Sequence, residues 1–131
     1  MTNSNKTTRH IDELHFEHKL WKAELNFYAD ELSVYSNRLA EVALKNNKDE
    51  MPSKIEHFQN QFLIQKEQLD ILNHELNLHQ DDLVKFAKEF PIAIDHRLFP
   101  DQEILHDKID IFRKIYMDLK KEVNSFFATW L

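Results

Sequence analysis

The feature that most constrains this chain is an apolar spacing of alternating three and four residues, which continues through three long stretches. Such spacing gives an α-helix one apolar seam and is typical of coiled-coil-like packing between helices. The chain also has no glycine, so the tight turns of β-hairpins are disfavoured. The three seams are Ile11, Leu14, His18, Trp21, Leu25, Tyr28, Leu32, Tyr35, Leu39 and Val42; Ile55, Phe58, Phe62, Gln65, Leu69, Leu72, Leu76, His79, Leu83 and Phe86; and Leu105, Ile109, Phe112, Tyr116, Leu119, Val123, Phe126 and Trp130.

Asparagine and proline mark the ends of the expected helices. Asn46 suits a helix C-terminus when glycine is absent, Pro91 ends the second helix, and Pro100 suits the first position of the third. We therefore predict one all-α domain over residues 1–131, an antiparallel up-down-up bundle of three long helices with coiled-coil-like packing. The helices would cover residues 8–46, 53–89 and 101–130, and the apolar segment 91–99 would cross the end of the bundle.

Histidine occupies two seam positions where leucine would be expected, at His18 and His79. If the first turn is centred near residue 49 or 50, His18 is level with Asp81 and Asp82. If the second connection is centred near residue 95, Asp82 is level with Lys108. In this arrangement, seven of the eight histidines gather at one end of the bundle.

Carboxylates accompany these histidines at helical spacing. Glu75 and His79 are four residues apart, as are His106 and Asp110, so each pair shares a helix face. Imidazole and carboxylate ligands without thiolate suit iron, manganese or zinc, and helical bundles use such pairs to hold two metal ions. The sequence therefore predicts a metal-binding bundle with a His/carboxylate site at one end and an oxygen or redox role. The predicted ligands are His18, Glu75, His79, Asp82, His106 and Asp110.

The same histidines also have an interpretation without metal. A buried histidine needs only a hydrogen-bond partner, so His18 and His79 could form a polar layer inside a non-enzymatic interaction or scaffold protein. A third hypothesis is a pH-responsive bundle whose histidine-rich end loosens on protonation. Apolar residues outside the seams predict a homodimer. This second stripe consists of Leu20, Phe27, Val34, Ile64, Ile71 and Leu78.

Charge and hydropathy exclude several classes of partner. The chain carries 17 Lys and Arg residues against 23 Asp and Glu residues, and its net charge of −6 argues against a nucleic-acid partner. No apolar run is long enough to cross a membrane. The polar start MTNSNKTTR lacks the apolar region of a signal peptide, which predicts a cytoplasmic location. The absence of cysteine excludes disulfides and thiolate ligands.

Four stretches of the sequence are HFEHKLWKAELNFYADEL, EHFQNQFLIQ, LNHELNLHQDDL and AIDHRLF. These stretches resemble a family of small all-helical bacterial proteins of about this length. The resemblance covers most of the chain and implies a helical fold without implying an activity. Histidine and carboxylate ligands inside a bundle are also similar to the hemerythrin-like and ferritin-like families. The hemerythrin-like His-x3-Glu motif is reversed here as Glu75-x3-His79, and one ferritin-like motif is present as Glu103-x-x-His106.

Overall fold

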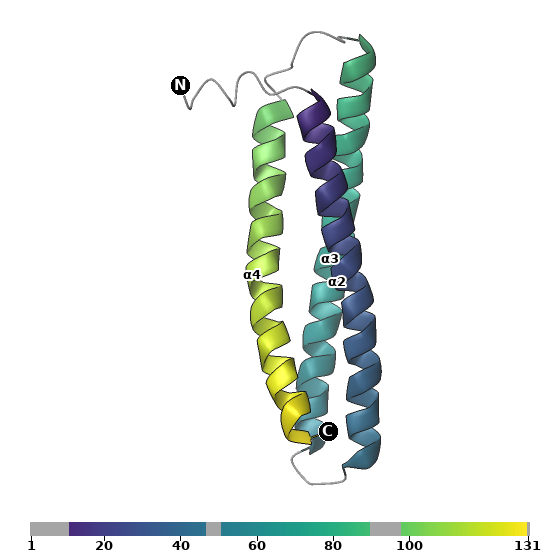
Figure 1. Ribbon diagram of the computed structural model, residues 1–131, viewed down its shortest axis with the longest axis vertical. Coiled ribbons are helices and arrows are strands. Elements are labelled where there is room, and N and C mark those ends of the chain that lie inside the picture. Colours follow the sequence, from purple (N-terminus) through teal and green to yellow (C-terminus); the bar gives the residue numbers. More distant parts are fainter. Residues whose placement is uncertain (1–10, 47–50, 90–97, 131) are drawn as a thin grey trace.

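The computed structural model describes residues 11–46, 51–89 and 98–130, which form three long helices packed against one another (Figure 1). They are α2 (Ile11–Lys45), α3 (Met51–Glu89) and α4 (Leu98–Trp130). Figure 1 shows that α2 and α4 begin at the same end of the bundle and that α3 runs between these ends in the opposite direction. No strand occurs in these ranges. The predicted all-α three-helix bundle is confirmed.

The helix ends follow local chemistry. At the end of α2, the backbone N–H of Asn46 donates to the Val42 carbonyl over 3.1 Å, and its side-chain amide donates to the carbonyls of Val42 and Trp130. The other two helices begin before their predicted starts, at Met51 and Leu98 rather than at residues 53 and 101. Proline fits inside the first turn as well as before it, because the N–H groups there have no helical partner.

The predicted seams form the buried core. Leu25, Val42, Ile109 and Val123 have no exposed surface, and they belong to one large apolar cluster that runs from Trp21 to Phe127. Leu14 and Leu83 form a separate, smaller cluster with Ile11 and Phe86 beside it. The two clusters are separated by a layer of buried polar side chains, which is the candidate functional site.

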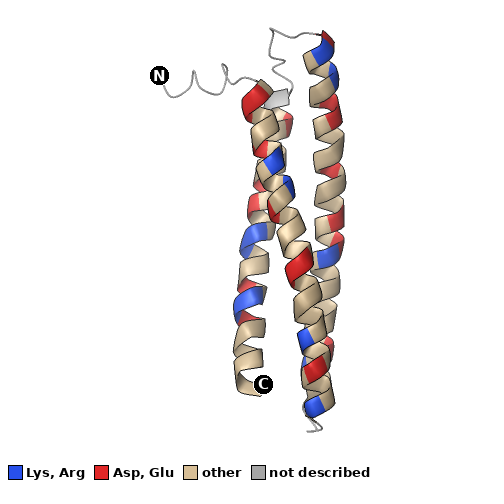
Figure 2. Ribbon diagram, turned by 45° about the vertical axis from the view of Figure 1, so that its right-hand side comes forward, with Lys and Arg blue, Asp and Glu red and all other residues tan. Residues whose placement is uncertain are grey.

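Charged side chains of both signs are distributed along all three helices (Figure 2). On α4 four of the six acids lie before residue 111, and the five bases lie between Lys108 and Lys121. Two predictions fall wholly or partly on residues outside the described ranges. One is the crossing of the bundle end by segment 91–99, of which only the last two residues are described. The other is the placement of His10 and His96 at the histidine-rich end.

Candidate functional site

Each helix contributes one buried polar side chain to a single layer across the bundle. His18 comes from α2, His79 from α3 and Gln102 from α4, and they are 4%, 7% and 1% exposed. The two imidazole rings lie edge to face with their centroids 5.0 Å apart. The seam positions of His18 and His79 therefore face each other as the sequence predicts, and Gln102 joins them.

Gln102 binds both histidines through one oxygen. Its Oε1 accepts hydrogen bonds from His18 Nε2 at 2.6 Å and from His79 Nε2 at 2.7 Å. Its amide nitrogen donates to Glu17 Oε1 at 2.7 Å. A carboxylate only accepts hydrogen bonds, so Glu17 fixes the orientation of the Gln102 amide. Because the amide oxygen also only accepts, both histidines must carry a proton on Nε2.

A second glutamine extends the layer toward the surface. Gln80 Oε1 lies 2.5 Å from His18 Nδ1, and the Gln80 amide nitrogen lies 2.8 Å from His15 Nδ1. The layer is thus a continuous chain of side chains in which glutamines alternate with histidines. Its members are His15, Gln80, His18, Gln102, His79 and Glu17.

Burial lowers the pKa of His79 below its ordinary value, and the hydrogen bond to Gln102 opposes this effect only in part. The neutral imidazole is favoured because the apolar surroundings solvate a charged ring poorly. On its outer side, His79 borders a hollow of about 220 Å³. The other residues that line the hollow are Glu75, Leu78, Asp82, Asp101, Ile104 and Leu105.

The predicted metal-binding function is wrong. Among residues 11–46, 51–89 and 98–130, no group of three or more histidine, aspartate or glutamate side chains is placed to hold a metal ion. His18 and His79 are bridged by the Gln102 oxygen. The other predicted ligands have different partners. Glu75 pairs with Lys108 at 2.9 Å, and Asp110 pairs with Arg113 and Lys114. His106 is exposed and pairs with Asp107, and Asp82 is exposed beside the hollow.

A shift of α4 explains why these residues do not meet. The predicted register placed Lys108 level with Asp82, whereas Lys108 pairs with Glu75, seven residues or two helical turns earlier on α3. His106 and Asp110 are displaced with it, away from His79. By contrast, the predicted register of α2 against α3 is accurate to about one residue, since His18 bonds to Gln80 rather than facing Asp81.

Sequence reasoning missed the two glutamines of the layer. Gln102 could have been found, because extending the third seam back by three residues from Leu105 reaches it. Gln80 lies beside a seam position and carried no comparable signal. Hydrogen-bonded glutamine rather than carboxylate therefore satisfies the buried imidazoles.

A second polar region lies between α2 and α4. Arg113 donates to both carboxylate oxygens of Glu24, at 2.5 and 2.8 Å, and the Tyr28 hydroxyl donates to the same group. The Arg113 hydrogen bond lowers the pKa of Glu24, while burial and Glu24 raise the pKa of Tyr28 to about 12. Farther along, Glu31 accepts from Tyr116 and Lys120 at 2.7 and 2.9 Å. These pairs fasten α4 to α2.

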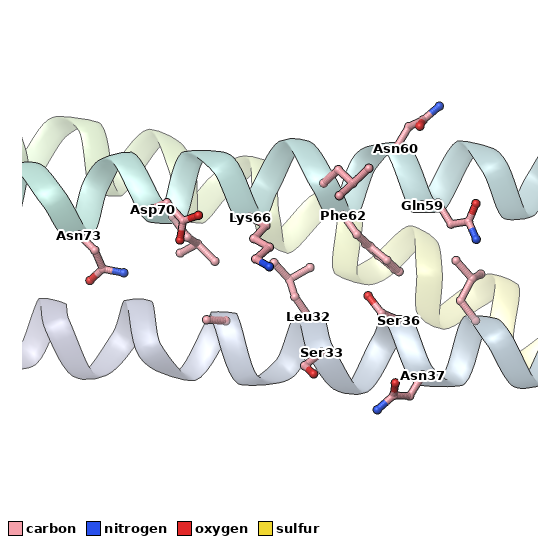
Figure 3. A pocket seen from close by; sticks show the side chains of 14 residues that line it. Leu32, Ser33, Ser36, Asn37, Gln59, Asn60, Phe62, Lys66, Asp70 and Asn73 are labelled. Atoms are coloured by element: carbon pink, nitrogen blue, oxygen red, sulfur yellow. The ribbon is translucent and has the colours of Figure 1, made fainter.

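An open groove of about 580 Å³ lies between α2 and α3 (Figure 3). Leu32 and Phe62 line its apolar part, and Figure 3 shows Ser36 on α2 pointing toward α3. Its charged lining residues are Lys66 and Asp70, which belong to one helix and are both exposed. The groove thus has a polar rim and an apolar floor.

Comparison with known proteins identifies no relative. No family model, no curated protein and no solved structure matches this chain. None of the described helices contains a stretch that is long and apolar enough to span a lipid bilayer. The geometry of the molecule therefore carries the functional conclusion.

Proposed function

We propose that this protein is a non-enzymatic helical interaction protein that forms a homodimer through an apolar surface on α3 and α4. The observation that supports the proposal is a set of six aliphatic side chains, 47% to 59% exposed, which we call the α3–α4 stripe. Its members are Ile64, Ile71 and Leu78 on α3, and Ile104, Ile111 and Ile115 on α4.

The two helices present these residues on the same side of the bundle. Leu78 and Ile104 line one hollow between α3 and α4. The Lys108–Glu75 ion pair joins the same sides of the two helices midway along the stripe. Residues seven apart on a helix lie on one face, so the remaining members continue the surface along both helices.

The predicted homodimer stripe is divided by this arrangement. Leu20, Phe27 and Val34 are exposed as predicted. Each lies three residues after a glutamate of α2 that bonds to α4, and these glutamates are Glu17, Glu24 and Glu31. The three apolar residues therefore lie on the opposite flank of α4 from Ile71 and Leu78. The α3–α4 stripe is the wider of the two surfaces because two helices contribute to it.

The energy available is suited to reversible association. Burying the exposed half of one aliphatic side chain contributes about 1 kcal/mol, so six on each of two copies contribute on the order of 12 kcal/mol. Association costs about 4–15 kcal/mol in lost translational and rotational freedom. The net free energy of association is then at most about 8 kcal/mol, so the tightest dissociation constant in this range is about micromolar and the dimer is reversible.

Exposed charges on α4 favour a second copy of this chain as the partner. Asp101 and Asp107 precede Ile111, and Lys114 and Lys121 follow it at similar distances along the helix. A two-fold axis near Ile111, perpendicular to the helices, would place each acid beside a base of the other copy. Three exposed charges depart from this order: Asp118, and Lys108 and Glu122, which pair with Glu75 and His57 of the same copy. The cytoplasmic location that the sequence predicts forms part of the same proposal.

Sedimentation equilibrium across a range of concentrations tests the proposal. The wild-type chain should show a monomer–dimer equilibrium, and Ile111→Glu should remain monomeric at every concentration because each dimer would bury two unpaired charges. Phe27→Glu is the matched control, since it places the same charge on the other flank, and it should dimerise like the wild type. A wild-type chain that stays monomeric to the highest soluble concentration would refute the proposal.

A further inference from the structure

Both ring nitrogens of His18 face amide oxygens. Nε2 lies 2.6 Å from Gln102 Oε1, and Nδ1 lies 2.5 Å from Gln80 Oε1. Amide oxygens accept hydrogen bonds and cannot donate them, so each of these two contacts requires a proton on the ring nitrogen. A neutral imidazole carries only one such proton. The observed arrangement is therefore complete only when His18 is an imidazolium.

We propose that the polar layer is a buried proton-binding site, in which His18 carries the proton and the Gln80 amide reverses when the proton leaves. In the proton-bound arrangement, Gln80 accepts from His18 Nδ1 and donates to His15 Nδ1. After His18 Nδ1 releases its proton to water, the reversed Gln80 amide donates to His18 Nδ1. Its oxygen then accepts from His15, whose proton moves through solvent from Nε2 to Nδ1.

The surroundings of the two glutamines explain why one turns and the other does not. Gln102 lies between the Glu17 carboxylate, which only accepts, and two imidazole N–H groups, so one orientation alone satisfies it. Gln80 lies between two imidazoles, and an imidazole nitrogen can present either a proton or a lone pair. Reversal of Gln80 therefore keeps every hydrogen bond of the layer.

Charges around the layer suit a single proton. From α2, His15 contacts Gln80 and Glu17 contacts Gln102; from α3, the His79 ring lies beside His18; and the charges of Asp82 on α3 and Asp101 on α4 act on His79. The carboxylates favour one positive charge in the layer. Burial disfavours the charged form of His79, and the second amide oxygen, Gln80 Oε1, faces the ring of His18. This inference does not depend on dimer formation.

Nitrogen-15 spectroscopy of the histidine rings in the intact chain tests the proposal, with His57 as an exposed reference ring. On lowering the pH from 8 to 5, His18 should pass from one ring proton to two, and the side-chain amide of Gln80 should shift with the same midpoint. In Gln80→Glu, a carboxylate that only accepts should raise the doubly protonated fraction of His18 at pH 7 at least two-fold. In Gln80→Leu, the same fraction should fall at least two-fold.

Two results would overturn the proposal. One is a His18 ring that keeps a single proton down to pH 5 while the chain remains folded. The other is an unchanged His18 population in a folded Gln80→Glu variant. The glutamate variant preserves the shape of the side chain, so it keeps the proposal testable if Gln80→Leu fails to fold.

Discussion

The two flanks of α4 are built from opposite kinds of contact. Toward α2, the contacts are polar: Glu24 with Arg113, Glu31 with Tyr116 and Lys120, and Glu17 with Gln102. Toward α3, the surface at the same levels carries the aliphatic residues of the α3–α4 stripe, with the Lys108–Glu75 pair among them. The α2 flank also exposes Leu20, Phe27 and Val34, but only the α3 flank has half-exposed aliphatic side chains on both of its helices.

This difference separates two tasks. The polar pairs fix the axial position of α4 along α2, because a shift of α4 by one helical turn would separate each side chain from its hydrogen-bond or ion-pair partner. Aliphatic side chains fix the axial position of a helix only weakly, but their burial supplies free energy for binding another surface. The α2 flank thus positions α4 within one copy, and the α3 flank is the surface that the proposed homodimer would use.

The largest effect is expected at Gln102, where the two flanks meet. Gln102→Leu leaves the buried Nε2–H groups of His18 and His79 without their acceptor, and the free energy of unfolding should fall by about 3 kcal/mol. Denaturant unfolding measures the change. Gln65→Leu is the matched control: Gln65 is 4% exposed and its Oε1 has no hydrogen-bond partner among the described residues, so replacing it should leave stability unchanged or raise it by up to about 1 kcal/mol. Equal losses in both variants would refute the role given to Gln102.

A smaller difference is expected between the ion pairs on the two flanks. Arg113→Gln should lower the free energy of unfolding by about 1–2 kcal/mol, because the Glu24 carboxylate that it binds in bidentate fashion is partly buried. Lys108→Gln should cost no more than about 1 kcal/mol, since its pair with Glu75 is more exposed. Measurement at low protein concentration removes any contribution from association. A larger loss for Lys108→Gln would reverse the comparison.

The smallest effect is expected from the pH dependence of His79. Its pKa is lower in the folded chain than the ordinary 6.5, so the unfolded state takes up a proton first as the pH falls. The stability that the neutral ring contributes is fully present above about pH 6.5 and is lost as the pH falls through the folded pKa. His79→Gln, which can still donate to Gln102, should have a flatter stability profile between pH 7 and 5 than the wild type. Parallel profiles would contradict this assignment.

The sequence predicts the helices and the first register because both depend on local information. The seams alternate by three and four residues, which identifies the helices. Only five residues separate Lys45 from Met51, so the short connection leaves α3 little freedom in its register against α2. Eight residues separate Glu89 from Leu98, and that length allows α4 to begin at several heights. The resulting shift of α4 by two turns places His106 and Asp110 away from His79. The ligands of the predicted metal site therefore do not come together.

The polar layer was predictable only in part. Histidine at a seam position is visible in the sequence, and the pairing of His18 with His79 followed from the first register. The partner that joins them depends on the height of α4, so it required the structure. Similarly, the sequence shows apolar residues outside the seams. Their division between the two flanks of α4 depends on which face of α2 bonds to α4 through Glu17, Glu24 and Glu31, and the sequence does not specify this.

Cysteine cross-linking tests the proposed dimer most directly, because the natural chain contains no cysteine. A two-fold axis near Ile111 brings the two copies of this residue within the short distance that a disulfide requires. Under mild oxidation, Ile111→Cys should therefore form a covalent dimer at micromolar concentration, while Phe27→Cys should remain monomeric. Rapid cross-linking of Phe27→Cys together with none for Ile111→Cys would show that the copies meet on the other flank and would contradict the account.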